Sequence, residues 1–288
     1  MTNHLDWDPS AVGDTSASHW RVCVFFFLWW LECQSCHQPQ SFPYERTDPW
    51  FLVYCPAPVT IIFFIYLFVV WFGPKLMENR KAFDLKPVLI TYNFSLVGLS
   101  SYMFYEFLVT SLLANYSYLC QPVDYSNSKL GIRMAKVCWW FYISKVVELL
   151  DTVCKNEKKN IFQITFLHVY HHCTMIFNWW AAVKYVAGGQ SFFIGMLNSF
   201  VHVVMYLYYG LAAMGPQMQK YLWWKRYLTI LQLVQFFGIA AHTFYNLFSD
   251  CDYPDGFNFV VCLYIVSLIL LFGNFYYQSY VNHKRKEE

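Results

Sequence analysis

Seven apolar stretches, each of roughly 16 to 25 residues, constrain the fold of this chain more than any other feature. They cover residues 58–73, 87–109, 135–154, 162–186, 191–211, 227–248 and 257–279. A helix needs about 20 apolar residues to cross the hydrocarbon core of a bilayer. Because the chain is also 57% hydrophobic and only 13% charged, we expect an all-α integral membrane protein with seven transmembrane helices rather than a soluble domain.

The first part of the chain does not fit this pattern. Residues 22–31 are strongly apolar, but the run is too short to span a bilayer and Glu32 follows it directly. We therefore expect neither an eighth span nor a cleaved signal peptide here. The predicted organisation is a lumenal N-terminal region (1–57), a membrane domain (58–280) and a basic tail (281–288).

Lysine and arginine are concentrated in alternate connections between the expected helices. The basic segments are 75–86, 155–159, 220–226 and 284–286. Cytosolic loops of membrane proteins carry an excess of Lys and Arg, so we expect these segments and the C-terminus in the cytosol and the N-terminus in the lumen. The sequon Asn115-Tyr116-Ser117 then falls in a lumenal loop, which makes Asn115 a candidate for N-glycosylation.

Two of the ten cysteines, Cys120 and Cys251, also fall in loops assigned to the lumen. An oxidising compartment would allow them to form a disulfide. The alternative is two free thiols, because a sequence by itself does not fix cysteine pairing.

The chain ends in Lys284-Arg285-Lys286-Glu287-Glu288, with lysines three and five positions from the carboxyl end. Lys284 and Lys286 resemble the cytosolic dilysine retrieval signal of endoplasmic reticulum membrane proteins. The alternative is a plain basic tail that lies at the membrane surface. The first interpretation places the protein in the endoplasmic reticulum membrane.

Three histidines lie in the middle of an apolar segment, in the run Leu-His-Val-Tyr-His-His-Cys-Thr-Met (167–175). His168, His171 and His172 have the spacing i, i+3 and i+4, which places them on one face of a helix. Ionisable side chains within a membrane span are costly and generally functional. We therefore expect these imidazoles to take part in chemistry.

Other expected helices also carry a polar face at helical spacing. The residues are Lys145, Glu148, Asp151 and Thr152; Asn198 and His202; and Thr229, Gln232, Gln235 and His242. A bundle that encloses one shared chamber would satisfy all of these faces together. Two plainer alternatives stay open: an ion pair between Lys145 and Glu148 that only stabilises its helix, and hydrogen bonds of Gln235 and His242 that only join helices.

Three classes of function compete for the histidine cluster. A neutral imidazole is a competent nucleophile toward a thioester, which suggests acyl transfer. His-x-x-His-His is also one of the histidine boxes of membrane di-iron desaturases and hydroxylases, but such enzymes need about eight histidines and only five lie in the expected spans here. A seven-helix receptor or transporter would leave the cluster without a role.

The polar segments together resemble the four signature blocks of the fatty acid elongase family, in the same order and spacing. The blocks are Lys145-Val-Val-Glu148-Leu-Leu-Asp151-Thr152, His168-Val-Tyr-His171-His172, Asn198-Ser-Phe-Val-His202-Val-Val-Met205-Tyr206-Leu-Tyr208-Tyr209 and Thr229-Ile-Leu-Gln232-Leu-Val-Gln235. The sequence around His168, together with Gly188-Gly189-Gln190, is most similar to the animal branch of the family, which elongates very long or polyunsaturated fatty acids.

This resemblance implies a condensing enzyme of microsomal fatty acid elongation. Such an enzyme joins an acyl-CoA to malonyl-CoA and releases carbon dioxide, CoA and a 3-oxoacyl-CoA that is two carbons longer. The implied fold has seven membrane helices, six of which form an inverted barrel around an acyl tunnel closed at its lumenal end. The resemblance also favours the bridge between Cys120 and Cys251, since both match linked loop cysteines of the family.

The resemblance further implies roles for individual residues. His171 would be the nucleophile that carries the acyl group in a ping-pong scheme, and His202 would position malonyl-CoA or stabilise its enolate. His168 and His172 would orient substrates or act as acid and base, and Asn198 would be a hydrogen-bonding partner. For the charge that develops on the thioester oxygen, the candidate donors are Lys145, Tyr208 and Asn198.

Residues along the expected path of CoA follow from the same resemblance: Lys145, Lys158, Gln163, Lys225, Thr229 and Gln232. Glu148, Asp151 and Gln235 would be structural polar residues. The implied partners are the lipid bilayer, acyl-CoA, malonyl-CoA, other enzymes of the elongation cycle and a second copy of the chain, with no nucleic acid, no metal and no cofactor. The run 154–159 is more polar than in relatives, which predicts an early end to the helix expected over 135–154.

Overall fold

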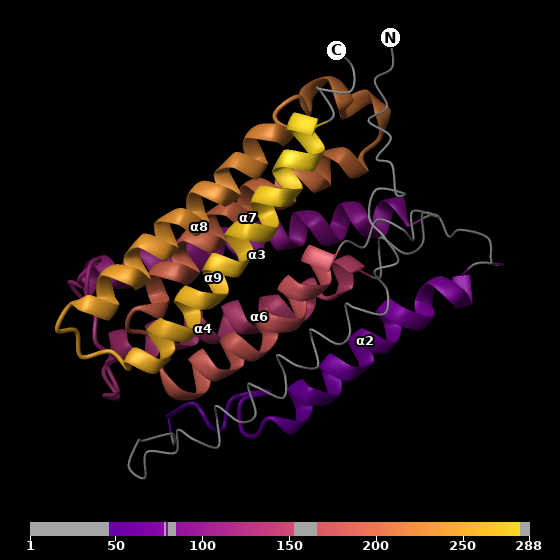
Figure 1. Ribbon diagram of the computed structural model, residues 1–288. Coiled ribbons are helices and arrows are strands. Elements are labelled where there is room, and N and C mark those ends of the chain that lie inside the picture. The colour runs from indigo at the N-terminus through magenta and orange to yellow at the C-terminus, as the bar shows by residue number, and fades with distance from the viewer. Residues whose placement is uncertain (1–45, 78, 80–84, 153–165, 283–288) are drawn as a thin grey trace.

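The computed structural model describes residues 46–77, 79, 85–152 and 166–282, and the regular elements in these ranges are all helical. Seven long α-helices lie side by side (Figure 1). They are α2 (Ala57–Met77), α3 (Lys86–Leu113), α4 (Lys129–Glu148), α6 (Phe166–Tyr185), α7 (Ser191–Ala213), α8 (Lys225–Phe248) and α9 (Asp255–Tyr276). A 3-10 helix, η4 (Pro216–Tyr221), precedes α8, and a π-helix, η5 (Tyr277–Asn282), follows α9.

Each apolar stretch in the sequence corresponds to one of these helices, but the helix expected over 135–154 begins earlier than predicted. Helix α4 begins at Lys129, and it ends at Glu148, in agreement with the early end expected from the polar run 154–159. The early start has a local cause, because the Ser128 hydroxyl accepts a hydrogen bond from the Gly131 amide at 3.0 Å and caps the helix. The first turns of α4 contain polar residues, so the length of the apolar stretch did not predict where the helix begins.

Six of the helices form a closed ring. In order around it, α3 packs on α4, α4 on α6, α6 on α9, α9 on α8, α8 on α7 and α7 on α3. Helix α2 packs on α6 from outside the ring, where the rings of Phe63 and Phe177 meet at 5.1 Å. Contacts between α4 and α7 also cross the ring. Polar residues of α4, α6 and α7 can therefore meet inside it.

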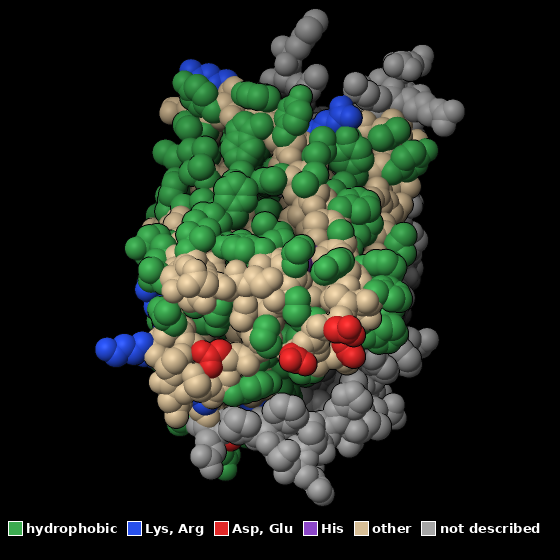
Figure 2. All heavy atoms as spheres, turned by 90° about the vertical axis from the view of Figure 1, so that its left-hand side faces the viewer, with side chains coloured by type: hydrophobic (Ala, Val, Ile, Leu, Met, Phe, Trp, Pro, Cys, Tyr) green, Lys and Arg blue, Asp and Glu red, His purple; other side chains and the backbone are tan. Residues whose placement is uncertain are grey.

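The outer surface of the bundle is largely hydrophobic. Figure 2 shows one face, where hydrophobic side chains cover much of the height and acidic side chains gather toward the lower end. Large apolar side chains such as Phe237 and Leu270 are 58% and 69% exposed. Within the described residues, four helical segments are long and apolar enough to cross a membrane: Lys86–Leu113, Ser191–Ala213, Lys225–Phe248 and Asp255–Asn282. Helices α4 and α6 carry the charged and histidine side chains that lower their hydropathy.

A disulfide ties together one end of the ring. Cys120, in the loop after α3, is bonded to Cys251, in the loop after α8, with a Cα–Cα distance of 5.7 Å. The Gln190 side-chain amide lies beside this bond and donates to Oδ1 of Asn246 at 2.8 Å and to the Leu119 carbonyl at 3.3 Å. We refer to this end, formed by loops 114–128, 186–190 and 249–254, as the disulfide end.

The loop before α4 is organised by Asp124. Its carboxylate accepts hydrogen bonds from the Ser126 amide and the Ser128 hydroxyl, both at 2.9 Å. Arg46 donates to the backbone carbonyl of the same residue. Partial burial raises the pKa of Asp124, but the hydrogen bonds of Ser126 and Ser128 and the charge of Arg46 outweigh it and lower the pKa below its ordinary value.

Candidate active site

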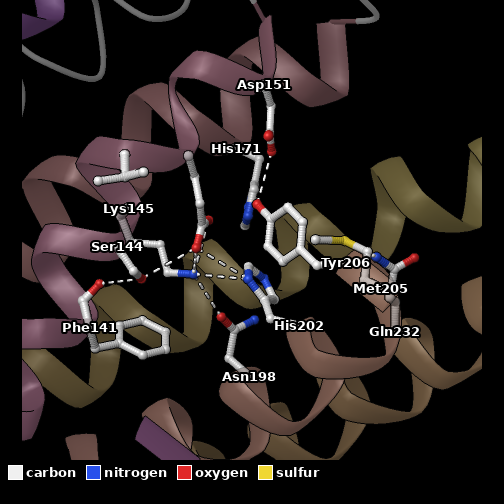
Figure 3. A network of polar contacts seen from close by, with 12 residues as sticks. Phe141, Ser144, Lys145, Asp151, His171, Asn198, His202, Met205, Tyr206 and Gln232 are labelled. Carbon is white, nitrogen blue, oxygen red and sulfur yellow. Dashed lines mark hydrogen bonds and ion pairs between the residues drawn. The ribbon is translucent and has the colours of Figure 1, made fainter. Parts of the chain in front are cut away.

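The ammonium group of Lys145, in the last turn of α4, lies at the centre of a buried polar cluster (Figure 3). Its Nζ atom is 2.8 and 3.0 Å from the two carboxylate oxygens of Glu148, 3.1 Å from Oδ1 of Asn198 and 3.3 Å from Nδ1 of His202. Lys145 and Glu148 are each 1% exposed. The cluster therefore joins α4 to α7 at a site from which solvent is excluded.

The charges in this cluster are compensated by several partners. Removing an ion pair from water costs several kcal/mol per ion, so a buried pair persists only when further hydrogen bonds satisfy it. The hydroxyl of Ser144 lies 3.3 Å from Oε1 of Glu148, and the Lys145 ammonium also lies 4.3 Å from the centre of the Phe141 ring. The pair of Lys145 and Glu148 thus joins two helices, because its other partners include side chains of α7.

His202 uses one ring nitrogen in the cluster. Its Nδ1 atom lies 3.2 Å from Oε1 of Glu148 and 3.3 Å from Nζ of Lys145. Depending on the tautomer, this nitrogen donates to the carboxylate or accepts from the ammonium group. In either case these contacts at Nδ1 fix the orientation of the ring.

The three histidines of α6 lie on one helical face, as their spacing predicts. The ring centres of His168 and His172 are 4.3 Å apart, and those of His171 and His172 are 5.6 Å apart. Nε2 of His168 is 2.9 Å from the hydroxyl of Thr152, which is 3.0 Å from the hydroxyl of Tyr66 on α2. The face is therefore held by side chains from outside α6.

The histidine faces of α6 and α7 approach the same space. In Figure 3, the rings of His171 and His202 point toward a common region beside Tyr206. The hydroxyl of Tyr206 donates to Oδ2 of Asp151 at 2.9 Å, which connects α7 to the residues directly after α4. Two imidazoles from different helices thus face one site inside the ring, next to a buried ammonium group.

The expected CoA residues are spread over a wider region. Thr229 is 5% exposed and its hydroxyl lies 3.4 Å from that of Tyr280, while the Gln232 amide lies 3.5 Å from Sδ of Met205. Lys225 is exposed at the first residue of α8. These side chains lie on α8, at and beyond the ring end opposite the disulfide.

Some predicted site residues are not part of the cluster. Tyr208 was a candidate oxyanion donor, but its ring packs against Trp224 with centres 5.0 Å apart, and it lies six residues beyond His202 on α7. Gln235 is buried on α8. Four further residues fall outside the described ranges: Lys158, Gln163, Lys284 and Lys286.

A family model described as "GNS1/SUR4 family", of the ELO type, matches residues 51–288. The chain belongs to the ELO family. Very long chain fatty acid elongase 4 of Macaca mulatta is 46% identical over 282 residues, covering 98% of this chain and 87% of that protein. Very long chain fatty acid elongase 7 of Rattus norvegicus is 48% identical over 243 residues, covering 83% and 86%. Very long chain fatty acid elongase 1 of Homo sapiens is 46% identical over 233 residues, covering 80% and 84%.

These similarities confirm the family resemblance predicted from the four signature blocks, including its animal very-long-chain branch. The ELO protein is accordingly a multi-pass membrane protein. The alignment with elongase 4 covers 98% of the chain, so it also includes most of residues 1–57, a region that contains none of the four signature blocks.

Two residues that contact the histidine face of the ELO protein were missed from the sequence. Tyr264, on α9, has its hydroxyl 3.0 Å from Nδ1 of His171, and Tyr66, on α2, reaches His168 through Thr152. A weak signal was available for Tyr264, because Ser267 follows it at i+3 in the middle of a largely apolar helix. No spacing rule within one helix could have connected either tyrosine to α6.

Within the described part of the chain, no three His, Cys, Asp or Glu side chains come together as a metal-binding group. The imidazoles instead contact hydroxyl groups, and Glu148 is engaged by Lys145.

Proposed function

We propose that this ELO protein is a very-long-chain fatty acid elongase that condenses an acyl-CoA with malonyl-CoA to give 3-oxoacyl-CoA, carbon dioxide and CoA. The observation that carries the proposal is the position of His171 beside the buried cluster of Lys145, Glu148, Asn198 and His202. The names of its relatives support the substrate class.

In the first half-reaction, His171 takes the acyl group. A ring nitrogen of the neutral imidazole attacks the thioester carbon, the carbon–sulfur bond breaks, and the departing CoA thiolate receives the proton that the imidazole loses. His172, with its ring beside both other histidines, and His168, held by Thr152, orient the reacting groups. The Lys145 ammonium and the Asn198 amide are the proposed donors for the charge that develops on the thioester oxygen.

In the second half-reaction, malonyl-CoA loses carbon dioxide beside His202. The bond to the carboxylate breaks, its electrons form an enolate, and the enolate carbon attacks the acyl carbon carried by His171. The carbon–nitrogen bond then breaks and returns its electrons to the ring, which takes up one proton from solution, so that His171 is again a neutral imidazole. His202 is suited to hold the enolate, because Glu148 and Lys145 fix its ring through Nδ1.

The seven long helices act as seven transmembrane spans, and the ring of six acts as the barrel that holds the acyl chain. The disulfide end is lumenal, which suits both an oxidised bond between Cys120 and Cys251 and a glycan on Asn115. The N-terminus is then lumenal and the C-terminus cytosolic. Lys284 and Lys286 retrieve the protein to the endoplasmic reticulum.

CoA enters at the opposite, cytosolic end. Its phosphates carry several negative charges, and Lys225 is an exposed cation at that end, with Thr229 and Gln232 further along the same helix. Lys158 and Gln163 belong to the same proposed path. Lys145 lies deeper, at the reacting end of the thioester.

The decisive experiment incubates the purified protein with acyl-CoA alone and searches for an acyl adduct by mass spectrometry of its peptides. We expect a mass increase on the peptide that contains His171, complete loss of the adduct in His171→Ala, and retention of the adduct in the control His242→Gln. His242 is a suitable control because it is buried on α8, where it stacks on Phe193 at 4.3 Å. Two bound irons per chain without any adduct would instead support a di-iron enzyme.

A further inference from the structure

Helix α9 brings one hydroxyl group within hydrogen-bonding distance of His171, the proposed nucleophile. The hydroxyl of Tyr264 lies 3.0 Å from Nδ1 of His171, and the Tyr264 side chain is 5% exposed. Helices α6 and α9 are neighbours in the ring, although the two residues are 93 positions apart in sequence. The pair therefore depends on the closed ring, and it is not part of any of the four signature blocks.

This contact determines which nitrogen of His171 can react. A neutral imidazole has one protonated nitrogen and one nitrogen with a lone pair, and the hydrogen bond made by one nitrogen fixes the state of the other. If Nδ1 donates to Tyr264, then Nε2 keeps its lone pair and is a nucleophile. If Tyr264 donates to Nδ1, then Nε2 is protonated and cannot attack a thioester.

The proposed reaction selects one of these two arrangements. Tyr264 occupies Nδ1 of His171 at 3.0 Å, so Nε2 is the nitrogen that can approach the thioester carbon. Nε2 attacks through its lone pair, so Nδ1 carries the ring proton and the Tyr264 oxygen accepts its hydrogen bond.

We propose that Tyr264 is a positioning residue that holds His171 in the tautomer protonated on Nδ1 and so presents an unprotonated Nε2 to the acyl thioester. This inference rests on the proposed function. As Nε2 bonds to the acyl carbon and the carbon–sulfur bond breaks, the proton of Nδ1 is lost and the CoA thiolate gains one. The Tyr264 hydroxyl then rotates and donates to Nδ1, because a phenol can both accept and donate.

The same interface contains a matched control. Tyr170, on α6, is 7% exposed, its ring centre lies 6.1 Å from that of Tyr264, and its hydroxyl is 2.8 Å from that of Ser267 on α9. Tyr170→Phe and Tyr264→Phe each remove one hydroxyl group between α6 and α9. Only Tyr264→Phe removes a partner of His171.

The first measurement determines the tautomer of His171 in the absence of substrate. Full-length protein is labelled with ¹⁵N-histidine in detergent, and the His171 resonances are identified by their loss in His171→Ala. We expect a protonated Nδ1 and an unprotonated Nε2 in the wild type and in Tyr170→Phe, and a mixture of the two tautomers in Tyr264→Phe. The proposal is overturned if the tautomer of His171 is the same in all three proteins.

The second measurement follows acylation by acyl-CoA in a single turnover. We expect Tyr264→Phe to slow acylation of His171 by about 10-fold, the lower end of the range for loss of such an orienting partner, with unchanged affinity for acyl-CoA. Tyr170→Phe should acylate at nearly the wild-type rate. An equal loss in both variants would show that the hydroxyl groups only hold the helices together, and would refute the proposal.

The two proposals fail in different ways. If the wild type forms no adduct on His171, the proposed nucleophile is wrong, whatever the resonances of the imidazole show. If the wild type forms the adduct and Tyr264→Phe forms it equally fast, the nucleophile stands and the role of Tyr264 is refuted.

Discussion

The Nζ atom of Lys145 lies 3.1 Å from Oδ1 of Asn198, which connects the buried ion pair of α4 to α7. The amide oxygen gives the ammonium group a partner beyond Glu148, so the lysine is held between two helices rather than along one. The charge is thereby fixed beside His202, where the proposed enolate forms.

Lys145→Met is expected to destabilise the protein by about 3 to 5 kcal/mol, because it leaves the Glu148 carboxylate buried without its counterion. The double variant Lys145→Met/Glu148→Gln should recover most of this stability, since it removes both charges, but it should not condense substrates. Thermal unfolding in detergent and an elongation assay measure the two effects. Recovery of activity in the double variant would show that the ammonium group has no part in the reaction.

The hydrogen bond from Tyr206 to Asp151 should contribute to stability. Tyr206→Phe removes the donor from a part-buried carboxylate contact at 2.9 Å and is expected to cost about 1 to 3 kcal/mol. Tyr209→Phe is the control, because Tyr209 is 40% exposed on the same helix. Thermal unfolding of both variants should show a lower midpoint for Tyr206→Phe only.

The disulfide between Cys120 and Cys251 should stabilise the disulfide end of the ring. It joins positions 131 residues apart, and in a chain-entropy model a loop of this length gains several kcal/mol, although helices that stay in the bilayer reduce this value. We expect Cys120→Ser, or a reducing agent, to lower the unfolding midpoint by an amount equivalent to about 2 to 4 kcal/mol. Cys55→Ser removes a free cysteine and should change the midpoint little.

The helices were predictable from the sequence because the length of an apolar stretch is a local property. The residues of other helices that contact the histidines were not predictable. The stretch 227–248 needs no tertiary information to be recognised as a helix, and it corresponds to α8 within two residues. The spacing of His168, His171 and His172 likewise placed them on one face. The contacts of Tyr264 and Tyr66 depend on which helices become neighbours in the ring, and no pattern within one helix carries that information.

The Asp124 carboxylate, in the loop before α4, should make the stability of the protein depend on pH in the acidic range. The pKa of Asp124 is lowered in the folded protein, so the carboxylate adds stability above its unfolded pKa of about 3.9, and this stability is lost as the pH falls through the folded value. Asp124→Asn should therefore be less stable than the wild type at pH 7. The difference in unfolding midpoint should shrink steadily below pH about 4. A constant difference down to pH 2 would show that the carboxylate charge is not responsible.

Asn115 provides a test of the proposed orientation. It lies two residues after the end of α3, is exposed, and has a φ of 52°, a conformation that asparagine tolerates better than most residues. If the disulfide end is lumenal, the protein made in microsomes should carry one endoglycosidase-sensitive glycan at this position. Ser117→Ala should abolish the glycan without changing the residue that adopts the positive φ, and Ser117→Thr should retain it, because threonine completes the sequon equally well. A glycan absent from both the wild type and Ser117→Thr would contradict the lumenal placement of this loop, since the acceptor side chain is otherwise accessible.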